Sequence, residues 1–147
     1  MPKLTEQEYA AIVEKRSPTS PSGKNISLAF IFGGLICCIG QAFADLYKEL
    51  FHLNTKDASL YSLLTLIFLA ALLTALHVYD NIAKVAGAGI IVPITGFANS
   101  VVSPAMEFKT EGFVLGMAAK MFVVAGPVLV YGITSAILYG LILLIFI

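Results

Sequence analysis

The sequence predicts an all-α integral membrane protein, with three full transmembrane helices and a re-entrant or discontinuous helical segment broken by glycine and proline. Of the 147 residues, 59% are apolar and only 12% are charged, whereas soluble domains carry about 25% charged residues. Four stretches contain no Asp, Glu, Lys or Arg, namely 25–44, 58–79, 85–106 and 121–147. Each reaches the roughly 20 residues that a helix needs to cross the hydrocarbon of a bilayer. This composition excludes a soluble globule and a disordered chain.

Residues 1–25 form a polar N-terminal segment, and residues 26–147 are expected to be a single membrane domain. Within the polar segment, 4–13 suit a short surface helix, and the Ser/Pro/Gly-rich 17–23 suit an irregular linker. The segment holds more basic residues than the first connection between helices (Lys3, Lys15, Arg16 and Lys24 against Lys48 and Lys56). Because cytoplasmic loops are enriched in Lys and Arg, we expect the N-terminus in the cytoplasm.

The first membrane helix is predicted over about 26–46. Its three glycines expose backbone that another helix can approach closely (Gly33, Gly34 and Gly40). The motif at 42–44 matches the A-x-A pattern of signal-peptide cleavage sites. The segment before it is longer and more acidic than a signal peptide, so we expect a retained helix. The adjacent Cys37 and Cys38 diverge on a helix and are expected to be small packing residues.

Two later stretches predict the other full crossings. The stretch 58–78 is apolar all round, as expected of a helix that faces lipid. After a polar corner, 112–147 would extend about 54 Å as one helix, well beyond a single crossing. Because Lys120 and then Gly126-Pro127 interrupt it, we expect an amphipathic helix at 112–125 and a span at 127–146.

Residues 85–106 are apolar but poorly suited to a helix that faces lipid. Three glycines lower the helix propensity, and Pro93 and Pro104 each interrupt the backbone hydrogen bonding. Since irregular backbone at membrane depth must be buried in protein or line water, we expect a broken or re-entrant helix pair. If this segment re-enters, the chain has three crossings and its C-terminus lies outside. If it crosses, there are four crossings and the C-terminus lies inside.

The sequence lacks the motifs of common enzymes. It contains no H-E-x-x-H, no Walker loop and no G-x-S-x-G elbow, and 86–89 lack the spacing of a dinucleotide fingerprint. Two adjacent cysteines without a nearby histidine make no zinc site. Nine basic and nine acidic residues leave no net charge with which to hold a nucleic acid. We therefore expect no enzyme, cofactor, metal site or nucleic-acid partner.

Five residues are candidates for a solute path or gate. Lys120 lies inside an apolar run, where an ionisable residue is costly and indicates a functional site by default. The alternatives are a side chain that reaches the membrane interface and an ion pair with Glu107 or Asp80. The other candidates lie in the broken segment, where half-helix N-termini attract anions (Pro93, Thr95, Asn99 and Ser100). For these, the alternative is a buried polar contact that holds two helices together.

Three charged residues are candidates for the mouth of this path: Asp80, Lys84 and Glu107. Asp80 and Lys84 are four positions apart, so on one helix they share a face and can form an ion pair. The alternative is a solvated pair at the membrane interface.

Eight motifs mark the membrane domain: GGLIC at 33–37, IGQ at 39–41, YD at 79–80, AGAG at 86–89, VPITGFANS at 92–100, EFKTEG at 107–112, MF at 121–122 and AG at 125–126. Together they resemble the stage V sporulation protein AC/AE membrane family, over roughly residues 26–135. The motif at 107–112 and the polar N-terminal extension look more like the AC branch than the shorter AE branch.

The resemblance implies a subunit of the machinery in the spore inner membrane that moves pyridine-2,6-dicarboxylate (dipicolinate), with calcium, during sporulation and germination. It also implies an AE-type membrane subunit and a soluble AD-type subunit as partners. A few helices fill their own centre with side chains, so a ring-sized solute needs a homo- or hetero-oligomer. The expected function is therefore one part of a channel or transporter. The alternatives are a non-conducting structural subunit that anchors a soluble partner, and a tension-gated release channel.

Overall fold

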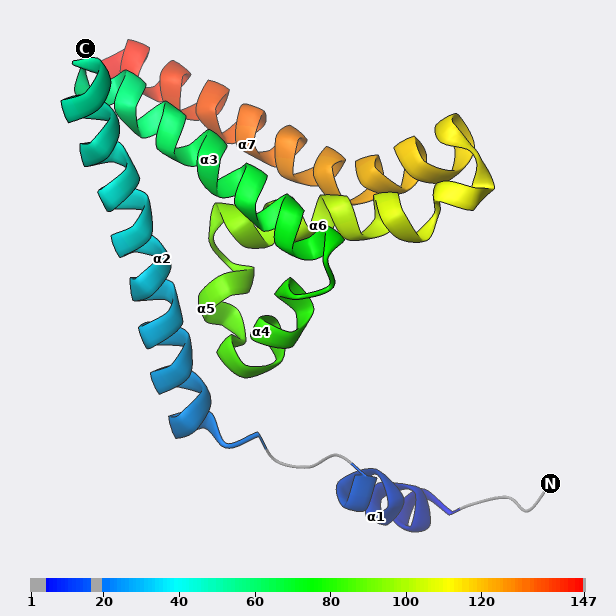
Figure 1. Cartoon of the computed structure of the whole chain (residues 1–147). Helices are drawn as coiled ribbons and strands as arrows, with labels where there is room; N and C mark the ends of the chain where they lie inside the picture. The colour runs from blue at the N-terminus through cyan, green and yellow to red at the C-terminus, as the bar shows by residue number, and fades with distance from the viewer. Residues whose placement is uncertain (1–4, 17–19, 147) are drawn as a thin grey trace.

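The computed structural model describes residues 5–16 and 20–146, which are almost entirely helical and include no strand. The elements in chain order are α1 (Glu6–Arg16), α2 (Ser22–Phe51), α3 (Thr55–Ala75), α4 (Tyr79–Ala86), α5 (Ala88–Ile91), α6 (Ile94–Glu107), the 3₁₀ turn η1 (Lys109–Glu111), the π-helical turn η2 (Phe113–Ala118) and α7 (Ala119–Phe146) (Figure 1).

Three helical elements of the described chain are long and apolar enough to cross a membrane: α2, α3 and the continuous stretch Phe113–Phe146. The predicted all-α membrane fold with three crossings is therefore confirmed. α7 continues as one α-helix through Gly126 and Pro127, where the sequence indicated a division. Lys3 and part of the expected linker, residues 17–19, lie outside the described residues.

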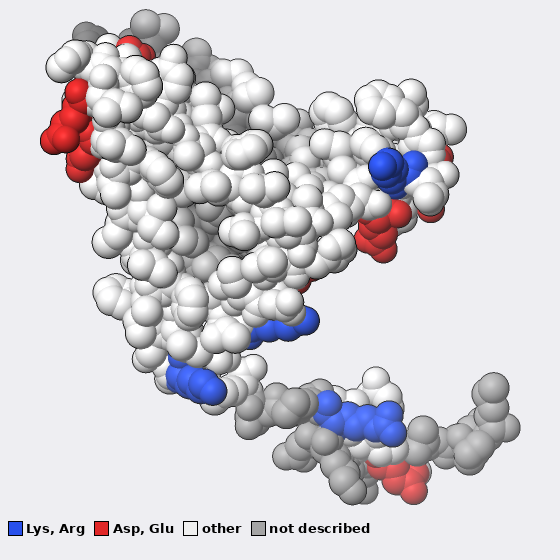
Figure 2. All heavy atoms as spheres, viewed as in Figure 1, with Lys and Arg blue, Asp and Glu red and all other residues white. Residues whose placement is uncertain are grey.

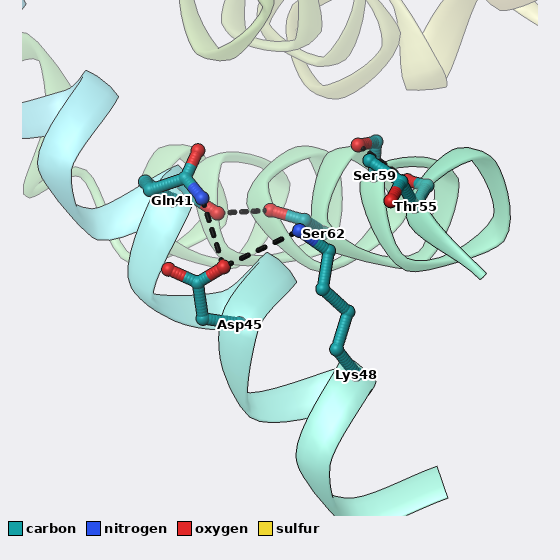
Figure 3. A network of polar contacts seen from close by, with 7 residues as sticks. Gln41, Asp45, Lys48, Thr55, Ser59 and Ser62 are labelled. Atoms are coloured by element: carbon teal, nitrogen blue, oxygen red, sulfur yellow. Dashed lines mark hydrogen bonds and ion pairs between the residues drawn. The ribbon is translucent and has the colours of Figure 1, made fainter. Parts of the chain in front are cut away.

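α2 and α3 are antiparallel and meet at a short turn. The Asn54 side chain begins α3 by accepting a hydrogen bond from the Asp57 backbone N–H at 2.9 Å. Further along, the Ser62 hydroxyl donates to the Gly40 carbonyl at 2.6 Å, which only a close helix approach allows. Beside this contact Asp45 accepts from Gln41 at 2.9 Å and pairs with Lys48 at 3.5 Å (Figure 3). Beyond it the helices diverge, and α4 and α5 lie between them (Figure 1).

The segment after α3 is a hairpin that returns to the side from which it starts. Ile67 in the middle of α3 lines a hollow with Ile94 and Ala98 at the start of α6. One to two turns later Thr74 of α3 bonds to Asn99 of α6, so the two helices run parallel. The 14 residues of α6 extend about 21 Å, less than the roughly 30 Å of hydrocarbon. This geometry matches the re-entrant alternative.

The hairpin breaks at two places. Gly87 has φ +54° and ψ −131°, a conformation that glycine adopts without steric cost, and it separates α4 from α5. Pro93, with ψ 171°, begins α6. The expectation that Pro104 also interrupts the segment was wrong, because Pro104 lies inside α6. Packing of α6 against α3 offsets the one hydrogen bond that a proline removes from a helix.

Small residues allow the hairpin to pack closely against the two long helices. A side chain at Gly89 of α5 would collide with the backbone of Ala29 in α2, and Gly33 of α2 also faces Gly89. The Tyr79 hydroxyl donates to the Ile90 carbonyl at 2.6 Å and ties α4 to α5. The core consists of the buried Ala70, Tyr79, Ala86, Ile90 and Ala98. By contrast, α7 contains no buried residue, so its surface must meet lipid or another protein.

Candidate functional site

A polar hollow of about 450 Å³ lies where α3 ends. Its walls come from the end of α3, the start of α4 and the end of α6, and it is lined by Thr74, His77, Asp80, Ser103, Met106 and Glu107. The structure thus brings together two of the predicted mouth charges, Asp80 and Glu107. In the described part of the chain no group of three or more His, Cys, Asp or Glu residues is arranged to hold a metal ion.

A helix-ending turn at His77 shapes this hollow. The His77 N–H donates to the Thr74 carbonyl and the Val78 N–H donates to the Leu73 carbonyl, both at 2.9 Å. This is the Schellman pattern, which usually places glycine at the left-handed position that His77 occupies with φ +58°. His52, which ends α2 with φ +51°, is the second histidine of the described chain in this conformation, and histidine is among the residues enriched there. The turn ends α3 at Ala75 and directs Asp80 towards α6.

The candidates Asn99 and Ser100 lie behind the hollow. The buried Thr74 hydroxyl donates to Asn99 Oδ1 at 2.8 Å and also lies 2.7 Å from the Ala70 carbonyl oxygen. Ser100 donates to the Phe97 carbonyl within α6 at 2.8 Å. Asn99 therefore joins α6 to α3, while the Ser100 hydroxyl forms its hydrogen bond within α6.

The candidates Pro93 and Thr95 lie at the tip of the hairpin. Pro93 is half-buried. The Thr95 side chain is 7% exposed, and its hydroxyl oxygen is buried with no hydrogen-bond partner. An unsatisfied hydroxyl in an apolar interior costs about 1–3 kcal/mol. Thr95 lines the apolar groove described next and not the polar hollow.

An apolar groove of about 280 Å³ lies beyond Thr95, between α2 and α3. The hairpin forms its floor through Tyr79, Ile82, Ile90 and Thr95. The groove and the polar hollow therefore lie on two sides of the same hairpin.

The two predicted lysines lie elsewhere. Lys120 at the start of α7 places its ammonium 4.5 Å from the centre of the Phe108 ring, which is a cation–π contact. Lys84 donates to Asn81 Oδ1 at 3.2 Å and lines a different hollow, with Asn25 at the start of α2. Among the described residues Asp80 forms no ion pair with Lys84, although the two share one helix.

Sequence reasoning missed four residues of the hollow, since the polar Thr74, His77 and Ser103 and the apolar Met106 were not chosen as site residues. Thr74 had a usable signal, since it is a polar residue near the end of an apolar span. The left-handed turn at His77 had none, because a histidine does not predict that conformation.

These features define a polytopic helical membrane protein with a re-entrant hairpin and a polar hollow at one membrane boundary. The chain belongs to the SpoVAC/SpoVAEB sporulation membrane protein family, which matches residues 25–142. It is 45% identical over 137 residues to Stage V sporulation protein AC of Bacillus subtilis (strain 168), with 93% of this chain and 91% of that protein covered. No solved structure matches the chain. The family resemblance seen in the sequence is confirmed, and the family is one of sporulation membrane proteins rather than a known enzyme family.

Proposed function

We propose that the chain is a membrane subunit of a multi-component channel or transporter that moves dipicolinate, with calcium, across the spore inner membrane. One observation carries this proposal. The hairpin 79–107 ends next to a 450 Å³ hollow whose lining includes the Asp80 and Glu107 carboxylates, the His77 imidazole and the Thr74 and Ser103 hydroxyls. Polar and charged groups gathered at this membrane boundary supply the contacts that an ionic solute needs where it leaves water, because an unpaired ion in hydrocarbon is strongly unfavourable.

The charge of the hollow favours one form of the solute. Dipicolinate carries two carboxylates, and next to Asp80 and Glu107 the free dianion would be repelled. Calcium bound to dipicolinate removes that repulsion, because the complex presents a divalent cation to the two carboxylates. The hollow therefore supports entry of the calcium-bound solute rather than of the free anion.

The chain is expected to act within an assembly. α7 contains no buried residue, and in α2 only Ala44 is buried, so these helices leave long apolar faces free. The resemblance supplies an AE-type membrane subunit and a soluble AD-type subunit as partners for the homo- or hetero-oligomer. The positive-inside rule places the N-terminus in the cytoplasm, and the hollow then opens on the same side.

Replacing the polar pair behind the hollow tests the proposal. The double variant Thr74→Val with Asn99→Leu removes both partners of a buried hydrogen bond, which leaves neither of them unsatisfied. In a sporulating host we expect normal protein levels and a lower dipicolinate content of the spores. Thr65→Val is the matched control, because Thr65 lies in the same helix and bonds to Tyr47 at 2.7 Å, away from the hollow. Lys120→Ala tests the last candidate in the same assay. Normal dipicolinate in both the double variant and Lys120→Ala would remove these residues from the mechanism.

Thiol labelling separates a solute path from a non-conducting scaffold. In a Cys37→Ala, Cys38→Ala background, Ser103→Cys places a thiol in the hollow and Ser135→Cys places one on the exposed face of α7. We expect a membrane-impermeant thiol reagent to modify only Ser103→Cys, and calcium dipicolinate to slow that reaction. Labelling without protection by the solute would favour the scaffold, and flux opened by membrane tension alone would favour the release channel.

A further inference from the structure

One face of α2 carries two hollows of opposite character. Asn25 and Ala29 line the hollow that contains Lys84, and Phe32, Ile36 and Ile39 line the apolar groove. Steps of four and three residues keep all five side chains on one side of the helix. From Asn25 to Ile39 the helix rises about 21 Å, close to the 20–22 Å of half a bilayer with its headgroups (~40–45 Å in full). The face therefore spans the depth of one leaflet.

The groove suits a hydrocarbon chain. α2 and α3 diverge above the hairpin, so no protein side chain of the described residues closes the 280 Å³ between them. Tyr79 and Thr95 are the two side chains of its lining that carry a polar group; the Tyr79 proton is given to the Ile90 carbonyl at 2.6 Å, and the Thr95 oxygen is buried. A single buried hydroxyl offers water little, whereas an acyl chain from the bilayer gains van der Waals contacts with the apolar side chains of the groove.

The hollow at the start of α2 suits an anionic group. It measures about 410 Å³, and its lining of Asn25, Ile26, Ala29 and 84–88 includes Lys84 but no carboxylate. Lys24, next to Asn25, is exposed. Figure 2 shows basic side chains over the start of α2 and over α4 on the same side of the molecule. Only α5 separates this hollow from the groove, and its four residues rise about 6 Å, similar to the interfacial layer of one leaflet.

We propose that this face of α2 binds one anionic phospholipid, with its phosphate between Lys24 and Lys84 and one acyl chain in the groove between α2 and α3. The lipid completes the packing of the re-entrant hairpin, which the two diverging helices leave uncovered on this side. This site is separate from the polar hollow at Asp80 and Glu107, so it does not depend on the proposed transport function.

Thermal unfolding of the full-length protein in detergent tests the site. Dioleoyl phosphatidylglycerol, titrated into the detergent, should raise the unfolding midpoint, and dioleoyl phosphatidylcholine should raise it less. In the double variant Lys24→Gln with Lys84→Gln, the concentration of phosphatidylglycerol that gives half the effect should increase at least about fivefold, since each surface lysine contributes about that factor towards an anionic lipid. The matched control, Lys48→Gln with Lys56→Gln, lies at the other end of α2 and α3 and should behave as the wild type.

A second variant tests the chain in the groove. Leu35 lines the groove and is 54% exposed, so Leu35→Trp fills the groove without rebuilding the core. It should weaken stabilisation by phosphatidylglycerol, whereas Leu141→Trp on the exposed face of α7 should not. If Leu35→Trp does not fold, Leu35→Ala takes its place in this test, because it changes the same wall of the groove by enlarging it. Equal stabilisation by the two lipids, an unchanged response in both Leu35 variants, or the same stabilisation by inorganic phosphate alone would overturn the proposal.

Discussion

The contact between α5 and α2 gives the sharpest prediction, because a single methyl group is enough to disturb it. In Gly89→Ala the new Cβ would lie 2.8 Å from Ala29 Cα and 2.9 Å from the Ala29 carbonyl carbon. Carbon atoms in contact prefer about 3.5–4.0 Å, so α5 must move away from α2 by roughly 1 Å. The atoms that it meets belong to helix backbone and cannot turn aside as a flexible side chain would.

The cost follows from that shift. Overpacking a well-packed contact costs about 1–3 kcal/mol. Gly34→Ala is the matched control, because Gly34 lies in the helix that Gly89 contacts and its Cβ would have no neighbour within 4 Å. Removing a glycine from a helix interior there should gain about 0.5–1 kcal/mol. The two variants should therefore differ by about 1.5–4 kcal/mol in unfolding free energy. Gly33→Ala, 3.3 Å from the Gly89 carbonyl oxygen, should fall between them.

The assay is thermal unfolding of the purified variants in one detergent, followed by far-UV circular dichroism. For a chain of this length, 1 kcal/mol corresponds to about 2–4 °C, so the midpoints of Gly34→Ala and Gly89→Ala should differ by several degrees. Equal midpoints, or a Gly89→Ala protein more stable than Gly34→Ala, would refute the argument that α5 is seated directly on the backbone of α2.

Three further predictions concern single contacts. Thr95→Val removes a buried hydroxyl that has no partner and should stabilise the protein by about 1 kcal/mol in the same unfolding assay. A loss of stability would mean that the hydroxyl forms a hydrogen bond. Phe108→Leu removes the ring under Lys120 and should lower the unfolding free energy by about 0.5–2 kcal/mol. If the effects of Phe108→Leu and Lys120→Met on the unfolding free energy are strictly additive, the two side chains are not coupled. Glu8 accepts hydrogen bonds from the Thr5 backbone N–H and hydroxyl at 2.9 Å, which lower its pKa. Its contribution to α1 should therefore be complete above the ordinary glutamate pKa and be lost as the pH falls through the lowered value. Backbone chemical shifts of α1 would report this loss, and Glu8→Gln should abolish the pH dependence.

The polar end of the candidate site illustrates the limit of sequence spacing. Four-residue spacing places Asp80 and Lys84 on one helix face. It does not indicate which other side chains lie near enough to form a hydrogen bond or an ion pair with either of them. In the structure Asn81 accepts from Lys84, and Asp80 faces the hollow that Glu107 also lines. Asp80 and Glu107 are 27 positions apart in the sequence, and the parallel packing of α6 on α3 brings them together, which no local pattern encodes.

The sequence by itself determined the membrane class, the three segments long enough and regular enough to cross, and the presence of a broken segment. These follow from local chemistry, since the hydrocarbon requires about 20 apolar residues in a row and glycine and proline weaken helices wherever they occur. Only the tertiary structure decided where the breaks fall, at Gly87 and Pro93 but not at Pro104. It also decided that the segment turns back beside α3. Both outcomes depend on packing between residues that are far apart in the sequence. This packing stabilises Pro104 inside α6 and allows Pro93 to begin the same helix.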